Sequence, residues 1–220
     1  MTWPMRRRAT CLALAAAFVG LAGSARAGSY EDFFLGIELD RPAIVQRLLA
    51  KGFDVNSRSE DGQHGLYLAL REQSFEVVQV LVQHPSLEVD ATNRAGETLL
   101  MMAALRSQHA AMRTLIERGA VVNRPGWTPL HYAASGGDIA AVKLLLERGA
   151  EIDAVAPNGN TPLMMAAGFG LIDVADLLTS RGADARPVNK AGRSAADMAE
   201  SAGRQGLAER LRALSATQRR

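Results

Sequence analysis

One short pattern occurs five times in the sequence at a nearly constant spacing. Each copy has an anchor residue that follows a glycine by two positions and precedes an alanine by five. The anchor residues are His64, Thr98, Thr128, Thr161 and Ser194, and successive ones are 34, 30, 33 and 33 residues apart. Such a period is typical of chains that stack one supersecondary unit many times. Because no unit can bury its apolar face alone, the stack must be the folding unit.

The residue types within each copy predict a pair of helices. Thr128 and Thr161 are favourable N-caps, and Pro129 and Pro162 follow at the first helical position, where a missing N–H is harmless. Pairs of alanine in this first helix allow neighbouring copies to approach closely. An apolar stripe then indicates a second helix, which should end at a glycine in the left-handed conformation. The glycines at this position are Gly119, Gly149 and Gly182.

The third copy reads Gly126-Trp127-Thr128-Pro129-Leu130-His131-Tyr132-Ala133-Ala134 and resembles an ankyrin repeat. The resemblance implies an all-α solenoid of helix-turn-helix units, with short β-hairpin fingers between them. Composition agrees, because a hydrophobic share of 48% with only 5% aromatic residues suits small, closely packed helices. We place the ankyrin-repeat domain at residues 28–214, including a degenerate first unit. The units are about 29–60, 61–92, 93–123, 124–155, 156–188 and 189–214.

Some parts of the chain depart from this pattern. In the second unit His64 replaces the usual threonine, which predicts a weaker N-cap. Before the fourth unit, the segment 123–126 is three residues short, so we expect a shortened finger and a notch with Trp127 at its edge. The last unit should be polar on its outer side, and residues 215–220 are predicted to form a frayed tail.

Residues 1–27 have the three parts of a secretory signal peptide. Arginines at positions 6–8 form the basic part, residues 9–23 form the apolar part, and Ala25-Arg26-Ala27 supplies small residues for cleavage after Ala27. A retained membrane anchor is the alternative, but the apolar run is shorter than the roughly 20 residues that a spanning helix needs. We therefore expect export by the general secretory route and no membrane contact after cleavage.

The charge and cysteine content support the same view. The whole sequence has a net charge of +2 and a pI near 9.0, but without residues 1–27 it has 21 basic and 23 acidic side chains. The basic pI is therefore no argument for nucleic-acid binding, and we expect no nucleic-acid partner. Cys11 is the only cysteine, so the processed chain would have no disulfide, which is acceptable for a bacterial periplasmic repeat protein.

The resemblance implies a concave contact surface, because ankyrin-repeat proteins bind partner proteins with their fingers and first helices. Trp127 and Phe169 are the strongest candidates on this surface, since aromatic residues dominate interface hot spots. Local packing is the alternative role for both. The full set of partner-binding candidates is Gln63, Arg71, Glu72, Glu97, Leu105, Arg106, Trp127, Ser135, Asn160 and Phe169.

No residue pattern in the sequence favours catalysis or a metal site. The four histidines, at positions 64, 84, 109 and 131, do not have metal-ligand spacing. His131 and Ser135 are one helical turn apart, but the resemblance gives His131 a hydrogen-bonding role within the loops. The paired methionines 101–102 and 164–165 are expected to fill the core, with copper ligation as the alternative. We predict no cofactor, no metal and no catalytic residue.

These observations together predict a non-catalytic binding scaffold. We expect a monomer in a bacterial periplasm that binds or protects another protein. The first alternative is a secreted effector or an immunity protein that blocks a toxin. The second is an enzyme whose site has no recognisable motif. The partner protein is not identified by these residues.

Overall fold

The computed structural model describes residues 23–218, so the first 22 residues of the predicted signal peptide lie outside it. The predicted cleavage position, after Ala27, falls within the first helix and stays a prediction. Within residues 23–218 the chain forms twelve helices, which confirms the all-α fold. The helices are α1 (Gly23–Glu38), α2 (Pro42–Ala50), α3 (Gly65–Glu72), α4 (Phe75–Val82), α5 (Leu99–Leu105), α6 (His109–Glu117), α7 (Pro129–Gly136), α8 (Ile139–Glu147), α9 (Pro162–Gly168), α10 (Ile172–Ser180), α11 (Ala195–Ser201) and α12 (Gln205–Thr217).

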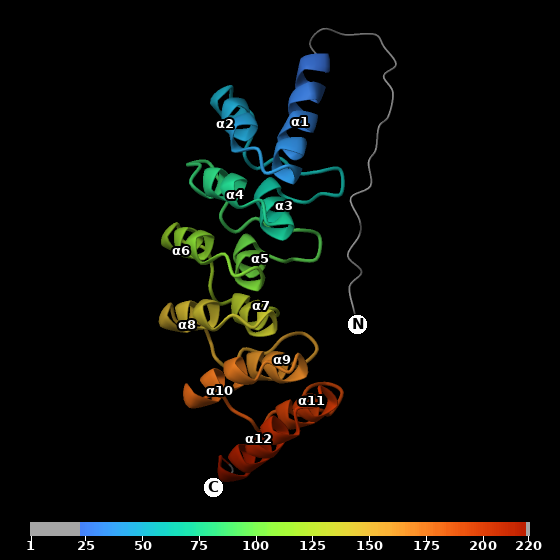
Figure 1. Ribbon diagram of the computed structural model, residues 1–220, viewed down its shortest axis with the longest axis vertical. Helices are drawn as coiled ribbons and strands as arrows, with labels where there is room; N and C mark the ends of the chain where they lie inside the picture. The colour runs from blue at the N-terminus through green and yellow to red at the C-terminus, as the bar shows by residue number, and fades with distance from the viewer. Residues whose placement is uncertain (1–22, 219–220) are drawn as a thin grey trace.

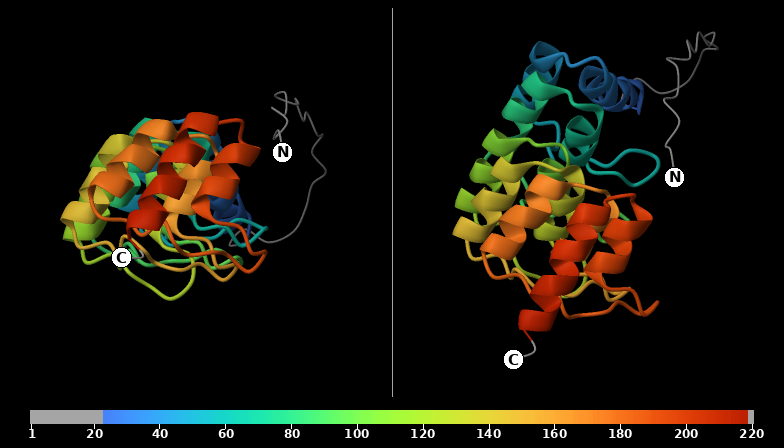
Figure 2. Two further views of the ribbon diagram at one scale, coloured as in Figure 1. Left: turned by 90° about the horizontal axis from the view of Figure 1, so that it is seen from below. Right: turned by 60° about the horizontal axis from the view of Figure 1, so that its bottom comes forward.

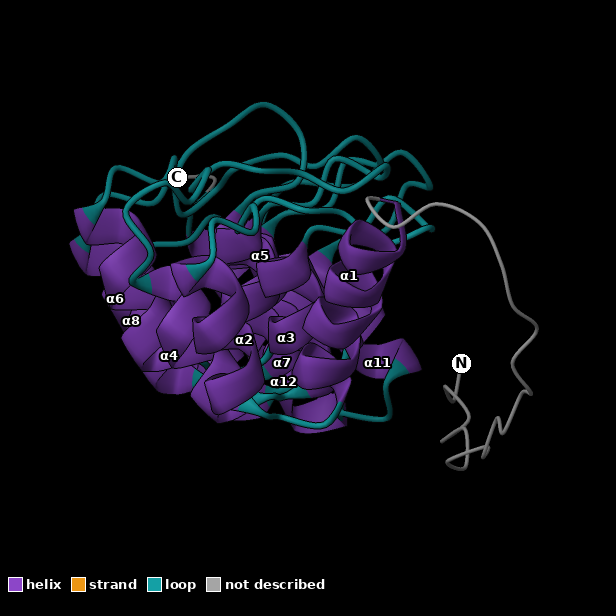
Figure 3. Ribbon diagram, turned by 90° about the horizontal axis from the view of Figure 1, so that it is seen from above, coloured by secondary structure: helices purple, strands orange, loops and turns teal. Residues whose placement is uncertain are grey.

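The helices stack as pairs in two layers (Figure 1). Odd-numbered helices pack on odd-numbered ones and even-numbered helices on even-numbered ones, from α1 and α2 at one end to α11 and α12 at the other. Viewed along the stack, successive pairs overlap (Figure 2), and the loops that join one pair to the next gather on one side (Figure 3). No helix of the described chain is both long and apolar enough to cross a membrane.

Small residues set the close spacing of the first layer. Ala133 and Ala134 are completely buried between neighbouring helices. A Cβ atom on Gly136 would lie 2.9 Å from the carbonyl oxygen of Leu105, which is closer than real Cβ contacts. Packing this close leaves no room for a larger side chain, so the alanine and glycine positions fix the distance between units.

The loops between units are less regular than the predicted β-hairpin fingers. Among the described residues only isolated β-bridges occur, at Arg58–His64, Thr92–Thr98 and Val188–Ser194. Four fingers have the same backbone hydrogen bond across the tip, for example from Asn93 N–H to the Glu97 carbonyl at 3.0 Å. Within residues 23–218, the shortened finger before Thr128 lacks this hydrogen bond across its tip. Each of the three bridged fingers is thus a tight turn closed by one antiparallel bridge, without extended strands.

A ladder of side-chain hydrogen bonds joins the loops of successive units. Asn123 illustrates it, because its Nδ2 donates to the Gly149 carbonyl at 2.7 Å and its Oδ1 accepts from Glu151 N–H at 2.9 Å. Asn56, Asp90 and Asp153 accept the corresponding N–H groups of Glu88, Val121 and Asp184. Each pair of neighbouring units is thus bonded as well as packed.

The C-terminal end differs from the predicted frayed tail. Helix α12 continues to Thr217, three residues beyond the predicted domain end at 214. Gln218 then closes the ladder, because its Oε1 accepts from Ala185 N–H at 2.9 Å and its Nε2 donates to the Ala183 carbonyl at 3.1 Å. These bonds fix Gln218, so residues 215–218 of the predicted tail belong to the folded domain.

The starts of α5, α7 and α11 are each held by a side chain three residues after the N-cap residue. The backbone N–H of Thr128 donates to His131 Nδ1 at 3.2 Å, and the same N–H of Thr98 lies 3.3 Å from Met101 Sδ. Met101 therefore takes the place of the motif histidine and is buried, as expected for the paired methionines of the core. His64 was predicted to weaken the cap of α3, but its Nδ1 accepts from Leu66 N–H at 3.1 Å, so the imidazole itself caps the helix.

Candidate functional site

Three consecutive first-layer helices, α5, α7 and α9, enclose an open, mainly apolar hollow of about 280 Å³. Four of the predicted contact residues line it together, although they come from three different units. The hollow is lined by Leu105, Trp127, His131, Tyr132, Ser135, Met165 and Phe169. Its volume is below the ~300 Å³ lower end for small-molecule pockets, and it suits one or two side chains.

Trp127 lies where the shortened finger meets α7. Its ring is half-buried and meets the rings of His131 and Tyr132 edge-on, with centroids 5.4 and 6.3 Å apart. Edge-to-face contacts of this kind stabilise aromatic pairs. Trp127 therefore both packs locally and forms part of the wall of the hollow, so the two roles considered from sequence coexist.

Phe169 also lines the hollow, and it is the large apolar residue of the lining that is most available to a partner. It is the C-cap residue of α9, and 62% of its surface is exposed. Burying an exposed phenylalanine contributes about 1.5–3 kcal/mol. An aromatic ring exposed beside an apolar hollow is the kind of feature that marks a binding surface.

His131 is fully buried, and its ring nitrogens are engaged by the fold. Nδ1 accepts from Thr128, and Nε2 lies 3.0 Å from the Asn160 carbonyl, to which the neutral imidazole donates. Burial lowers the pKa of His131 below its ordinary value, and the hydrogen bond to the Asn160 carbonyl opposes that shift. The Ser135 hydroxyl donates to the Tyr132 carbonyl at 3.0 Å, so His131 and Ser135 do not form a catalytic pair.

Glu97 lies among tyrosines from two neighbouring units. Its carboxylate accepts from Tyr67 at 2.5 Å, from Tyr132 at 2.7 Å and from Asn93 at 2.6 Å. Burial alone would raise the pKa of Glu97, but these hydrogen bonds hold it below its ordinary value. Burial and the bond to Glu97 raise the pKa of both tyrosines. Glu97 is therefore an ionised brace between units, and it fixes the ring of Tyr132 in the wall of the hollow.

The other candidates are distributed over different places. Arg106 directly follows the lining residue Leu105, and its enclosed Nε has no hydrogen-bond partner among residues 23–218. Asn160 is only 7% exposed and is bonded to Asn189 and Met165, so its predicted role as an exposed contact was wrong. Gln63, Arg71 and Glu72 lie towards the N-terminal end, where Arg71 and Glu72 pair with each other at 2.8 Å.

Sequence reasoning missed Tyr132 and Met165 as members of the site. Both stand four residues after their anchor residues, at the same place in two successive units. This position directly follows the one that holds the histidine of the motif. Comparing equivalent positions across units would have found them.

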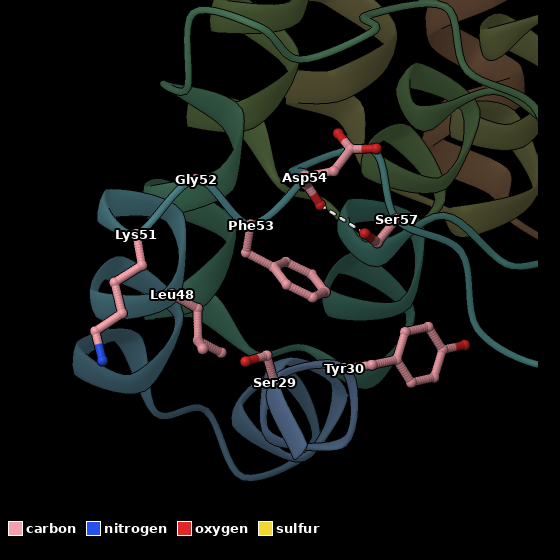
Figure 4. A pocket seen from close by; sticks show the side chains of 8 residues that line it. All are labelled: Ser29, Tyr30, Leu48, Lys51, Gly52, Phe53, Asp54 and Ser57. Carbon is pink, nitrogen blue, oxygen red and sulfur yellow. Dashed lines mark hydrogen bonds between the residues drawn. The ribbon is translucent and has the colours of Figure 1, made fainter. Parts of the chain in front are cut away.

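A larger hollow, of about 600 Å³, lies at the N-terminal end of the stack between α1, α2 and the first loop (Figure 4). Its lining is mixed, with Phe53 beside Lys51 and Asp54, and the dashed line in Figure 4 marks the 2.7 Å bond from the Ser57 hydroxyl to the Asp54 carbonyl. None of the predicted contact residues lines it. We therefore take the smaller hollow at α5, α7 and α9 as the candidate site. No group of three or more metal-ligating side chains gathers in the described part of the chain.

Comparison with known proteins agrees with the repeat pattern. A family model described as ankyrin repeats in three copies matches residues 34–125, 85–156 and 121–190, which together span well over half of the chain. Human transient receptor potential cation channel subfamily A member 1 is 26% identical over 84 residues, which is 38% of this chain and 8% of that protein. Mouse Rabankyrin-5 is 28% identical over 74 residues, which is 34% of this chain and 6% of that protein. The chain thus spans less than a tenth of either relative.

Proposed function

Because the chain belongs to the ankyrin-repeat family, whose members are generally protein-interaction scaffolds, we propose that it binds a partner protein through the hollow at α5, α7 and α9. One observation carries this proposal. Leu105, Trp127, Ser135 and Phe169 were selected from sequence as contact residues, and the fold gathers them around one hollow. A scaffold with a small apolar hollow and an exposed aromatic ring has the features of an interface hot spot.

The same residues support a non-catalytic role. His131 uses both ring nitrogens to join its own loop to the next unit, and Ser135 bonds its own helix. Glu97 is occupied by three donors. His131, Ser135 and Glu97 thus serve the fold and not a reaction, and the lining of the hollow offers a partner mainly apolar contact.

We further propose that the protein is exported and works in a bacterial periplasm, where it binds or protects its partner. The predicted leader at residues 1–27 and the lack of cysteine after it support this compartment. The alternative is a secreted effector or a toxin-immunity protein with the same fold. Fractionation of cells expressing the gene with a C-terminal tag separates the proposal from an effector, because the proposal expects the processed chain in the periplasm and an effector is released into the medium. Loss of protection against a toxin when the gene is deleted would identify an immunity protein.

A pull-down from the periplasm with the tagged full-length gene product tests the binding proposal. Trp127→Ala and Phe169→Ala should each weaken binding of the retained protein by about 2 kcal/mol, or roughly thirtyfold in Kd. Phe75→Ala is the matched control, because Phe75 is 50% exposed but belongs to α4 in the second layer. The proposal fails if no protein is retained, and the choice of site fails if both hollow variants bind as tightly as the Phe75 variant.

A further inference from the structure

The charges around the hollow indicate what the partner segment should carry. Arg106 directly follows the lining residue Leu105, and Arg124 lies close enough to Tyr132 to influence the pKa of its hydroxyl. Arg94 is exposed at the tip of the preceding finger, and Lys190 is exposed at the tip of the last complete one. None of these four cations forms an ion pair within residues 23–218.

The acidic side chain nearest the hollow does not neutralise these cations. The Glu97 carboxylate lies inward, where two tyrosines and Asn93 bond it. The Arg124 guanidinium donates to the Gly96 carbonyl at 2.9 Å with only one of its nitrogens. The enclosed Nε of Arg106 has no partner in the described chain, although buried polar groups normally have one. That nitrogen is enclosed, but the terminal nitrogens of Arg106 and the remaining nitrogens of Arg124 form no hydrogen bond within residues 23–218, so they remain available to an added carboxylate.

We propose that the hollow receives an aromatic or leucine side chain from an acidic segment of the partner protein, whose carboxylates pair with Arg106 and Arg124. This inference rests on the proposed function and adds the chemistry of the partner. Arginine favours this pairing, because its planar guanidinium binds carboxylates through two parallel hydrogen bonds. The apolar hollow supplies the contact area, and the cations set the orientation and speed of association.

The geometry favours a protein segment over single-stranded nucleic acid. Nucleic-acid grooves stack successive bases on several exposed aromatic faces. Here Trp127 is half-buried and meets its neighbours edge-on, which leaves Phe169 as the one strongly exposed ring of the lining. A hollow of about 280 Å³ accepts a side chain and not a row of bases.

A phage library of random twelve-residue peptides, panned on the full-length gene product, tests the inference. We expect enriched peptides to contain phenylalanine, tryptophan or leucine with at least two acidic residues within three positions. A synthetic copy of the most enriched peptide should bind about tenfold more weakly to the Arg106→Glu/Arg124→Glu variant, and binding should weaken as salt is raised from 50 to 300 mM. The Phe169→Ala variant should bind it at least tenfold more weakly.

Arg113→Glu/Arg181→Glu is the matched control, because both residues are exposed on second-layer segments and the variant changes the net charge equally. It should bind within twofold of wild type. The Arg106→Gln/Arg124→Gln variant removes charge without reversing it and should show an intermediate loss, so the result does not depend on one variant folding. Folding of each variant is checked by circular dichroism.

Four results would overturn the inference: enrichment of neutral or basic peptides, no enrichment at all, equal loss in the Arg113 and Arg181 control, or displacement of the peptide by an equimolar twelve-residue oligothymidylate. The proposed function can survive these results. If Phe169→Ala still abolishes capture of a periplasmic protein while acidic peptides are not enriched, the scaffold remains and only the acidic partner is excluded.

Discussion

Replacing His64 by threonine should remove much of the pH dependence of stability between pH 7 and pH 5. His64 is the N-cap residue of α3 and is 1% exposed. Its Nδ1 accepts from Leu66 N–H at 3.1 Å, so a proton on that nitrogen would break the cap, and its Nε2 lies 3.3 Å from Asn56 Oδ1. Burial, reinforced by the charge of Arg58, lowers the pKa of His64 from 6.5 to about 4.

The sign follows from proton binding in the two states. Between pH 6.5 and about 4 the unfolded chain binds a proton at His64 and the folded chain does not. Stability from this residue is therefore complete above pH 6.5 and is lost as pH falls through this range. Linkage between these two pKa values gives a loss of about 2 kcal/mol between pH 7 and pH 5, and about 3 kcal/mol by pH 4.

Urea unfolding of wild type and the His64→Thr variant at pH 7, 6 and 5 measures this difference. Threonine keeps an oxygen acceptor at the N-cap, as Thr98 and Thr161 do in their units. His131, whose pKa is also lowered, is present in both proteins, so its contribution cancels. Equal pH slopes for the two proteins would refute the reasoning, as would an NMR titration showing that His64 is protonated in the folded chain at pH 6.

Three further substitutions test the fold at single positions. Gly159→Ala would place a Cβ 2.7 Å from the Lys190 backbone nitrogen at a φ of +83°. The control is Gly149→Ala, because Gly149 has a similar φ of +80° but free space around the added Cβ. In thermal unfolding, Gly159→Ala should reduce the free energy of unfolding by at least about 1 kcal/mol more than Gly149→Ala does. Asn123→Ala should lower the free energy of unfolding in urea by about 1 kcal/mol, because both ladder hydrogen bonds are lost. Asn123→Asp should lower it less, because the aspartate keeps the acceptor for Glu151 N–H. Equal losses in the two variants would contradict this. Thr128→Ala should cost about 1 kcal/mol through its N-cap contacts, and a change near zero would exclude a role for the hydroxyl.

The stack of helix pairs could be predicted because its signals are local and occur in several copies. Thr128 with Pro129 and Thr161 with Pro162 begin α7 and α9 at the expected residues. The errors concern properties that depend on more distant residues. The general N-cap preference for threonine over histidine does not reveal that the imidazole of His64 caps α3, because this role depends on neighbouring residues that bury the ring. Composition does not show that α12 continues to Thr217, because Gln218 bonds a loop 33 residues earlier.

The candidate site was predictable to a similar extent. Leu105, Ser135 and Phe169 occupy comparable places at the ends of successive first helices, so a regular stack brings them together. Asn160 occupies a place comparable to that of Trp127, yet it is buried by bonds from Asn189 and His131, which belong to the units on either side. A single unit contains no information about such bonds, and periodicity therefore locates a position without giving its exposure.

The shortened finger shows how one unit can differ without disturbing its neighbours. Asn123, before the missing residues, keeps both ladder bonds to the next unit. Thr128, after them, still begins α7 and bonds His131. The missing residues therefore lie between Asn123 and Thr128, and their absence shortens only the tip, where the other fingers have a backbone hydrogen bond. Because the ladder and the helix start carry the stability, this tip can change freely, and Trp127 can border the hollow at little cost to the stack.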